Sequence, residues 1–342
     1  MVRKIIFYCL YYSGVAHLML FTNILRGRIP IVLFHRVSPE PDPCWPPLTP
    51  SSFENTIKLL SKHYHLYSLD ELLCSSKPST RACCIVFDDG FYDFKEYAFP
   101  VLLKYGVPVT LFIPTNNITN NQPIWTSEID SILLGADKNK DGTLLEIENK
   151  KILLRLKRDK DLFKTAASIK NLLLLTSPDD RNLIIKKIRS KIGSNQEQHY
   201  RLLSWTDVDE MKAAHPDLFT VESHTHTHPF LPSLNPEDLE SELLIARDIL
   251  KERNIVPADK IAYPIGGYDN KTLEATARYY KFGFAVKNRS VNLKSLNQTF
   301  YKYKIPRYNI HTEQPEETFM FINGFHSALK NRLGFLFRYL FN

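Results

Sequence analysis

Two adjacent carboxylates, Asp88 and Asp89, directly follow an apolar segment of the chain. Residues 85–87 are β-branched or aromatic, which predicts a buried strand that ends at the carboxylates. Gly90 comes next and permits a tight turn there. Because two charges beside a core are costly unless they are used, the pair suggests that one carboxylate binds a metal and the other acts as a base. A strand-end turn with solvated aspartates is the alternative, and this segment alone does not decide between them.

Three histidines within five residues follow a second strand-like segment, 218–221. His224 and His228 would be neighbours on a helical turn, whereas all three, with His226 between them, would share one face of an extended segment. Pro229 argues against a long helix through this point. Neutral imidazoles together with a carboxylate form a ligand set of the zinc type, so the pattern favours a metal site over an incidental loop.

These two segments, in this order, resemble the first two motifs of the polysaccharide deacetylases, which are the NodB-homology group or carbohydrate esterase family 4. Further segments fit the branch of that family in which the last motif has moved to the front, beginning with a Tyr-His-x-Val-like segment. The matching segments are 33–37, 87–90, 203–205, 223–229, 262–266 and 305–307. The resemblance extends from about residue 31 to about residue 310.

The resemblance implies a metal site and an acid–base pair. Asp89, His224 and His228 would hold one divalent metal, most often zinc, with cobalt or nickel as alternatives. Asp88 would be the general base that takes a proton from water. His35 ends the first predicted strand, and the resemblance makes it the acid that protonates the departing sugar amine; the reference pKa of histidine suits that role. A packed strand-end histidine is the alternative for His35.

The third motif departs from the family pattern at two positions. Its usual opening arginine is Ala262 here, and the tyrosine before its glycine is Ile265. An oxyanion donor survives the second change because it uses only the backbone N–H. Arg307 could replace the missing arginine and orient Asp88. The predicted oxyanion and substrate contacts are Ile265, Pro264, Tyr263 and Trp205. His226 is additional to the pattern, either a spectator or an alternative ligand.

Strand-like and helical segments alternate along most of the chain, which predicts an α/β fold with parallel strands. The resemblance specifies a distorted (β/α)7 barrel of the NodB-homology type, whose catalytic groups should lie at the C-terminal ends of strands. We expect a catalytic domain over residues 31–312, with a helical insertion at about 125–203. Residues 1–30 form an N-terminal amphipathic or hydrophobic helix that could contact a membrane, and 313–342 form a C-terminal amphipathic basic helix.

The composition is that of a globular protein, with 44% apolar and 24% charged residues and a formal net charge of +7. The charge favours acidic partners or an anionic membrane surface, and no nucleic-acid motif accompanies it. The cysteines are odd in number, and two of the five are adjacent, which indicates reduced thiols and a cytoplasmic location, with peripheral attachment to an inner membrane as an option. A periplasmic or secreted protein with an uncleaved N-terminal anchor is the alternative.

The N-terminal segment imitates a signal peptide, with basic residues followed by an apolar run. It lacks a small-residue cleavage site, and its apolar run is short for a membrane span. A helix in the membrane interface and an ordinary packed helix both fit it.

The sequence therefore predicts a metal-dependent hydrolase that removes N-acetyl groups from a sugar in a polysaccharide, an oligosaccharide or a lipid-linked glycan. A deformylase or esterase of the same fold, acting on a lipid-linked sugar, is one alternative. A non-catalytic glycan-binding protein is the other, although none of the four central residues, Asp88, Asp89, His224 and His228, has been lost.

Overall fold

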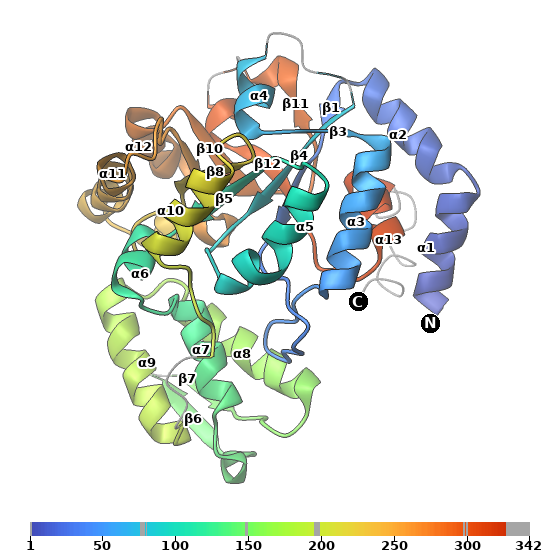
Figure 1. The fold of residues 1–342 in the computed structure, drawn as a ribbon. Coiled ribbons are helices and arrows are strands. Elements are labelled where there is room, and N and C mark those ends of the chain that lie inside the picture. Colours follow the sequence, from blue (N-terminus) through green and yellow to red (C-terminus); the bar gives the residue numbers. More distant parts are fainter. Residues whose placement is uncertain are drawn as a thin grey trace.

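Seven parallel strands close into a barrel at the centre of the molecule (Figure 1). The computed structural model describes residues 2–75, 79, 81–147, 150–194, 199–296, 298 and 300–325. Around the barrel the order is β2-β12-β10-β9-β8-β5-β4, and pairing of β2 with β4 closes it. The strands are β2 (Ile31–Phe34), β4 (Ala82–Phe87), β5 (Val109–Ile113), β8 (Phe219–Ser223), β9 (Lys260–Ala262), β10 (Phe282–Val286) and β12 (Ile305–Asn309). The predicted (β/α)7 barrel is confirmed.

The strands form where short apolar segments are buried on both faces, as parallel strands covered by helices require. Every residue of β2, β4 and β5 is buried. A short eighth strand, β3 (His65–Tyr67), pairs with the first half of β4, while β2 pairs with the second half. Because all the barrel pairings are parallel, the C-terminal ends of the seven strands meet at one rim.

Helices with clear start signals surround the barrel. They are α3 (Pro50–His63), α4 (Leu69–Cys74), α5 (Phe99–Lys104), α6 (Thr115–Asn120), α10 (Trp205–Ala214), α11 (Pro236–Glu252) and α12 (Asn270–Tyr279). Ser68 forms a capping box with Glu71 at the start of α4, and Asn235 caps α11. Thr49 caps α3, and Pro50 fits the first helical turn that follows. The helical segment after β4 begins as a π-helical turn, Phe94–Ala98.

The segment between α6 and α10 forms a lobe at the C-terminal rim of the barrel (Figure 1). It contains α7 (Trp125–Leu134), α8 (Asp159–Leu173) and α9 (Pro178–Ile192), and its aliphatic side chains form a separate core. An antiparallel hairpin, β6 (Leu144–Ile147) with β7 (Lys150–Leu153), was not expected there. The turn before this hairpin, residues 137–142, is held by two carboxylates. Asp137 accepts the backbone N–H of Asn139, and Asp141 accepts the backbone N–H of Leu156, so these carboxylates have a structural role.

The N-terminal segment is a bent pair of helices, α1 (Val2–Tyr12) and α2 (Val15–Leu25), which lies against α3 and α13 (Pro315–Ile322). A minor ribbon joins β1 (Arg28–Ile29) to β11 (Val291–Asn292). Among the described residues, no single helix is long and apolar enough to cross a membrane; the bent pair passes that test of length and composition only when its two helices are taken together. The predicted C-terminal helix lies mostly outside the described residues, which end at residue 325.

Candidate active site

The two adjacent carboxylates lie at the C-terminal rim, immediately after β4. The N–H of Asp88 still donates to Phe34 O at 3.2 Å, in register with the neighbouring strand. Asp89 and Gly90 then adopt positive φ angles of 75° and 74°, which turn the chain across the rim. A Cβ at position 90 would lie 2.9 Å from Ile113 Cγ2, so this turn needs glycine for both its conformation and its space. The backbone reversal directs the two carboxylates to different partners.

Asp88 forms a bidentate ion pair with Arg307 of β12. Arg307 Nη1 donates to Oδ1 at 2.6 Å and Nη2 donates to Oδ2 at 2.8 Å, and both residues are buried. Burial acts to raise the pKa of Asp88, but the charge and hydrogen bonds of Arg307 oppose it, and that pKa lies below its usual value. Asp88 is therefore held ionised and in a fixed orientation, as a general base must be.

Asp89 faces two histidines. Its Oδ1 lies 3.3 Å from His224 Nε2 and 3.2 Å from His228 Nε2, and one potential ligand atom from each of the three residues lies within 4.8 Å of the others. All three side chains are buried. The resemblance predicts this same set as metal ligands, and the structure brings them together.

The donor chemistry of this set fits a cation. His224 Nδ1 lies 2.8 Å from Ala262 O, a carbonyl that can only accept, so the ring proton belongs on Nδ1 and the Nε2 lone pair points at Asp89. Asp89 Oδ1 is buried without a hydrogen-bond partner. Lone pairs of nitrogen and oxygen that converge in this way are stabilised by a shared positive ion, and the carbonyl contact is the kind of outer hydrogen bond that orients a ligating histidine.

The loop that carries the histidines is an irregular turn, which resolves the choice between helical and extended geometry. Thr225 and His228 have positive φ angles of 69° and 57°. The carboxylate of Glu242, on α11, accepts the backbone N–H groups of His226 and Thr227 at 2.9 and 2.8 Å. Within this turn His224 and His228 both line the same cavity and contact Asp89. The ring of His226 instead contacts Thr115 Oγ1 at 2.9 Å, outside the ligand set.

A cavity of about 520 Å³ opens above these groups. Barrel residues form its floor and the lobe forms one wall; its lining includes His35, Trp45, Asp88, Asp89, Trp125, Phe163, Lys170, Asn171, Leu174, His224, His228, Ile265 and His311. A larger hollow of about 810 Å³ runs along the proline-rich loop 38–49 and contains none of the rim groups. We take the smaller cavity as the candidate site because it holds the convergent polar groups.

His35 lies in this cavity with its ring 5.6 Å from that of Trp45. Burial lowers the pKa of His35, although Asp89 and Asp88 act in the opposite direction. His311 lies at the same rim, and burial, followed by the charge of His35, lowers the pKa of His311 to about 4. A histidine that is neutral until it receives a proton can pass one to a leaving group.

The four predicted substrate contacts do not all lie at the cavity. Ile265 lines the cavity, and its φ of 58° is unusual for a β-branched residue. Tyr263 lies in the core and donates its hydroxyl hydrogen bond to Tyr303 O at 2.6 Å. Trp205 donates from Nε1 to Thr119 Oγ1 at 2.9 Å and does not line the cavity. Pro264 is buried and does not line the cavity either. The structure therefore places only Ile265 of the four at the site.

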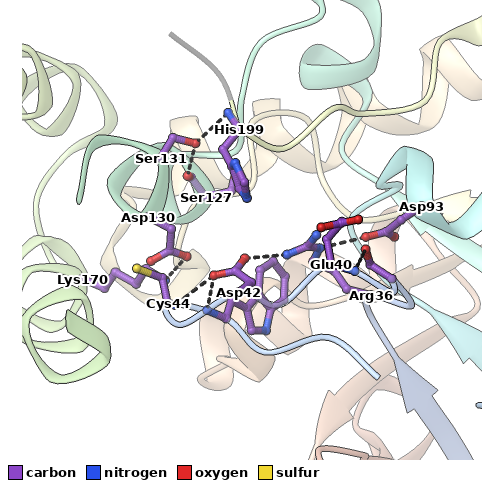
Figure 2. A network of polar contacts seen from close by, with 12 residues as sticks. Arg36, Glu40, Asp42, Cys44, Asp93, Ser127, Asp130, Ser131, Lys170 and His199 are labelled. Carbon is purple, nitrogen blue, oxygen red and sulfur yellow. Dashed lines mark hydrogen bonds and ion pairs between the residues drawn. The ribbon is translucent and has the colours of Figure 1, made fainter. Parts of the chain in front are cut away.

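A polar network, shown in Figure 2, joins the barrel to the proline-rich loop. Arg36 donates to Asp93 Oδ2 at 2.8 Å and to Asp42 Oδ2 at 2.7 Å. The other oxygen of Asp42 accepts the backbone N–H groups of Cys44 and Trp45 at 2.9 and 3.0 Å. Arg36 directly follows His35, so these bonds place the Trp45 indole against the predicted acid.

Figure 2 also shows Asp130 and Lys170 of the lobe beside Cys44 of the proline-rich loop. Lys170 of α8 donates to Asp130 of α7 at 2.5 Å, and the Asp130 side chain is fully buried. Burial raises the pKa of Asp130 to about 6, against the opposing charge of Lys170. The pair holds the Lys170 ammonium at the cavity wall. Sequence reasoning did not find Lys170, Asn171 or Phe163, because they belong to an ordinary amphipathic helix. It also missed His311, although this residue lies just after β12 and could have been found by its place at a strand end.

The barrel topology together with the rim carboxylates and histidines defines this molecule as a barrel of the NodB-homology type. Solved structures share the fold: a Streptococcus pyogenes deacetylase, PplD, in complex with acetate (19% identity, 86% of this chain and 98% of that one, TM-score 0.54); IcaB from Ammonifex degensii (15%, 86% and 96%, 0.54); and BC0361, a polysaccharide deacetylase from Bacillus cereus (19%, 85% and 67%, 0.54).

The family assignment comes from the sequence comparisons. Residues 188–282 match the family model described as polysaccharide deacetylase, a segment that includes both candidate histidine ligands and the 262–266 turn but not the carboxylate pair. A Bacillus subtilis (strain 168) protein named "Putative polysaccharide deacetylase YxkH" is 33% identical over 92 residues, 25% of this chain and 32% of that protein, so the match spans about a third of the relative's length. Over this part of its length the chain is therefore similar to the polysaccharide deacetylases.

Proposed function

We propose that this protein is a metal-dependent hydrolase that removes the acetyl group from an N-acetylated sugar of a glycan. One observation carries the proposal: a buried set of three acceptor side chains, Asp89, His224 and His228, lies beside a carboxylate that Arg307 keeps ionised. That combination supplies a metal site and a base at the floor of one cavity. The domain assignment supports a glycan as the substrate.

The three acceptors would hold one divalent ion, with zinc the first choice for a histidine–carboxylate set and cobalt or nickel as alternatives. A bound ion supplies Lewis acidity to water and to the amide carbonyl. Asp88 lies 3.8 Å from His224 Nε2, next to the ligand set, and would take the proton of the attacking water. Arg307 holds the Asp88 carboxylate in place through both oxygens.

The overall reaction adds water across the amide bond. The water oxygen bonds to the carbonyl carbon, the C–N bond breaks, and the nitrogen takes a proton as it leaves. His35 lies in the cavity and would deliver that proton. The products are acetate and a free sugar amine. The N–H of Ile265, which also lines the cavity, would donate to the carbonyl oxygen as negative charge develops there.

The cavity walls suit a sugar. Trp45, Trp125 and Phe163 offer ring surfaces, and Lys170 and Asn171 offer polar groups at the same wall. Apolar sides with a few polar groups are the usual composition of a small-molecule site. The sugar could belong to a polysaccharide, an oligosaccharide or a lipid-linked glycan.

The test measures bound metal and released acetate on the same protein samples. Asp89→Ala and His224→Ala should lose metal and activity together, whereas Asp88→Ala should retain metal and lose acetate release. His226→Ala is the matched control, because this histidine belongs to the same loop but its ring contacts Thr115. It should keep metal and most activity. Equal metal content in all four variants would refute the ligand assignment.

The substrate is tested with a panel of N-acetylated, N-formylated and O-acetylated sugars, each soluble and lipid-linked. Release of acetate from an N-acetyl sugar supports the proposal. Release of formate or of an ester-linked acyl group alone would identify the deformylase or esterase alternative. Glycan binding without release from any member of the panel, by metal-loaded protein, would favour a non-catalytic glycan-binding protein.

A further inference from the structure

The outer face of the N-terminal helix pair carries an exposed apolar surface. Seven large apolar or aromatic side chains on α1 and α2 are between 37% and 70% exposed: Ile5, Tyr8, Tyr12, Val15, Leu18, Phe21 and Leu25. Sixteen exposed side chains of this kind occur in the part of the chain that the structure describes, so almost half of them belong to this one helix pair. Single exposed apolar residues need no explanation, but a continuous group of them marks an interaction surface.

The opposite face of the pair is firmly packed, which fixes the orientation of the exposed face. Phe7, Tyr11 and Leu20 are buried. Tyr11 contacts His63 Nε2 at 2.7 Å, and the Asn23 amide donates to Asn323 O at 3.0 Å. Both faces of the helix pair are therefore apolar, and the rest of the protein covers only one of them.

The charges around the helix pair favour an anionic membrane as its partner. The sequence contains no aspartate or glutamate before Glu40, while basic residues stand at positions 3, 4, 26 and 28. Arg26 and Arg28 are exposed beside the end of α2. An apolar helix face with basic residues at its ends, tyrosines on it and no carboxylates fits the interface of an anionic bilayer. A contact between two copies would place these like charges close together.

The geometry also selects the mode of attachment. The two helices are bent by 63° with respect to each other, and neither is long enough to cross a bilayer alone. Crossing as a pair would pull Phe7, Tyr11 and Leu20 away from the barrel and leave the Asn23 amide without Asn323. Lying flat requires neither change. The exposed face of the pair can enter the membrane interface while the inner face stays on the barrel.

We propose that the outer face of α1 and α2 docks this protein on an anionic membrane surface, with the pair lying in the plane of the interface. This inference does not depend on the hydrolase activity. Docking in this way would bring the barrel close to a lipid-linked or membrane-proximal glycan without any part of the barrel crossing the bilayer.

The test is flotation of the full-length protein with vesicles of phosphatidylglycerol and phosphatidylcholine, compared with phosphatidylcholine alone. The wild type should float with the anionic vesicles. The triple variant Leu18→Glu/Phe21→Glu/Leu25→Glu should bind them at least tenfold more weakly. The control Leu175→Glu/Leu183→Glu changes two side chains that are 71% and 56% exposed on the lobe, and should bind as the wild type does.

A second variant separates the charge contribution. Arg26→Gln should weaken binding to anionic vesicles by roughly fivefold and should leave the weak binding to neutral vesicles unchanged. Circular dichroism and acetate release from a soluble substrate check that each variant is folded, because none of these side chains lies in the cavity. Equal flotation of the wild type and the triple variant would overturn the proposal. A wild type that does not float, and forms a dimer that the triple variant breaks, would overturn it in favour of a second copy.

Discussion

The buried ion pair between Asp88 and Arg307 gives the sharpest stability prediction. Arg307→Met keeps a long side chain at this position but removes both hydrogen bonds, at 2.6 and 2.8 Å, and leaves the Asp88 carboxylate buried without its partner. Breaking a buried pair from one side costs about 3–5 kcal/mol, and a charge pair at 4 Å in a protein interior is worth about 4 kcal/mol at an effective dielectric constant of 20. We therefore expect the free energy of unfolding to fall by about 4 kcal/mol.

The assay is urea unfolding followed by circular dichroism, with the variants Arg307→Met, Asp88→Asn and the combination of both. Removing both charges eliminates the unpaired carboxylate, so the double variant should be at least ~2 kcal/mol more stable than the sum of the two single losses predicts. Acetate release should fall by roughly 10²–10⁴-fold in Arg307→Met while bound metal is retained, because Arg307 acts on the base and not on the ligands.

Arg181→Met is the matched control for the loss of a buried guanidinium. Arg181 is 3% exposed and lies over the Trp125 ring at 4.6 Å, and no carboxylate of the described residues forms a salt bridge with it. Its removal should cost about 1 kcal/mol, the scale of one cation–π contact. The idea that Arg307 stabilises a buried Asp88 charge is wrong if Arg307→Met lowers the free energy of unfolding no more than Arg181→Met does. It is also wrong if the losses of stability in Arg307→Met and Asp88→Asn simply add in the double variant.

Three further predictions concern the cavity wall, the rim turn and the helix pair. The double variant Lys170→Met/Asp130→Asn, which removes both charges together, should raise KM for an N-acetylated oligosaccharide at least threefold with little change in kcat; an unchanged KM would show that Lys170 does not contact substrate. Gly90→Ala should lower the free energy of unfolding by about 1–3 kcal/mol in urea, because φ is 74° and the added Cβ has no room. Burial, followed by the charge of His17, lowers the pKa of His63 from 6.5 to about 4, so the folded protein binds fewer protons than the unfolded chain and loses stability as the pH falls from 6.5 towards 4. After allowance for the partial exposure of His63 its share of this loss is roughly 1–2 kcal/mol, so the loss of stability between pH 7 and pH 5, measured by urea unfolding, should be smaller by that amount in His63→Gln than in the wild type.

The sequence was sufficient to predict the part of the site that lies at strand ends. Asp88 and Asp89 follow an apolar segment buried on both faces, and His224 follows another, so the parallel barrel had to bring these groups to one rim. The pairing of Arg307 with Asp88 was also predicted, but from the family resemblance, in which Arg307 could replace the arginine missing from the third motif. Local patterns were sufficient because each of these residues belongs to a strand or directly follows one.

The cavity wall could not be predicted in the same way. Lys170 and Phe163 lie on α8, whose sequence alternates charged and aliphatic residues as any solvent-exposed helix does, and only the docking of the lobe makes them part of the site. The expectation for Tyr263 and Trp205 came from their place in the segments 262–266 and 203–205, which resemble family motifs. Their side chains pack away from the cavity because a neighbour two positions along a strand, or at a helix start, need not face the same way.

Asp88 and Asp89 are chemically identical neighbours, and the fold gives them different tasks through their partners alone. The turn at Asp89 sends its carboxylate towards the Nε2 atoms of two histidines, where we propose that a positive ion binds, while the carboxylate of Asp88 meets a guanidinium. Exchanging those partners would exchange the tasks. Had Asp88 also faced the histidines, both carboxylates would compete for the ion and no free base would remain beside it. On the proposed mechanism, the arginine on β12 would therefore determine which of the two carboxylates is available to take a proton from water.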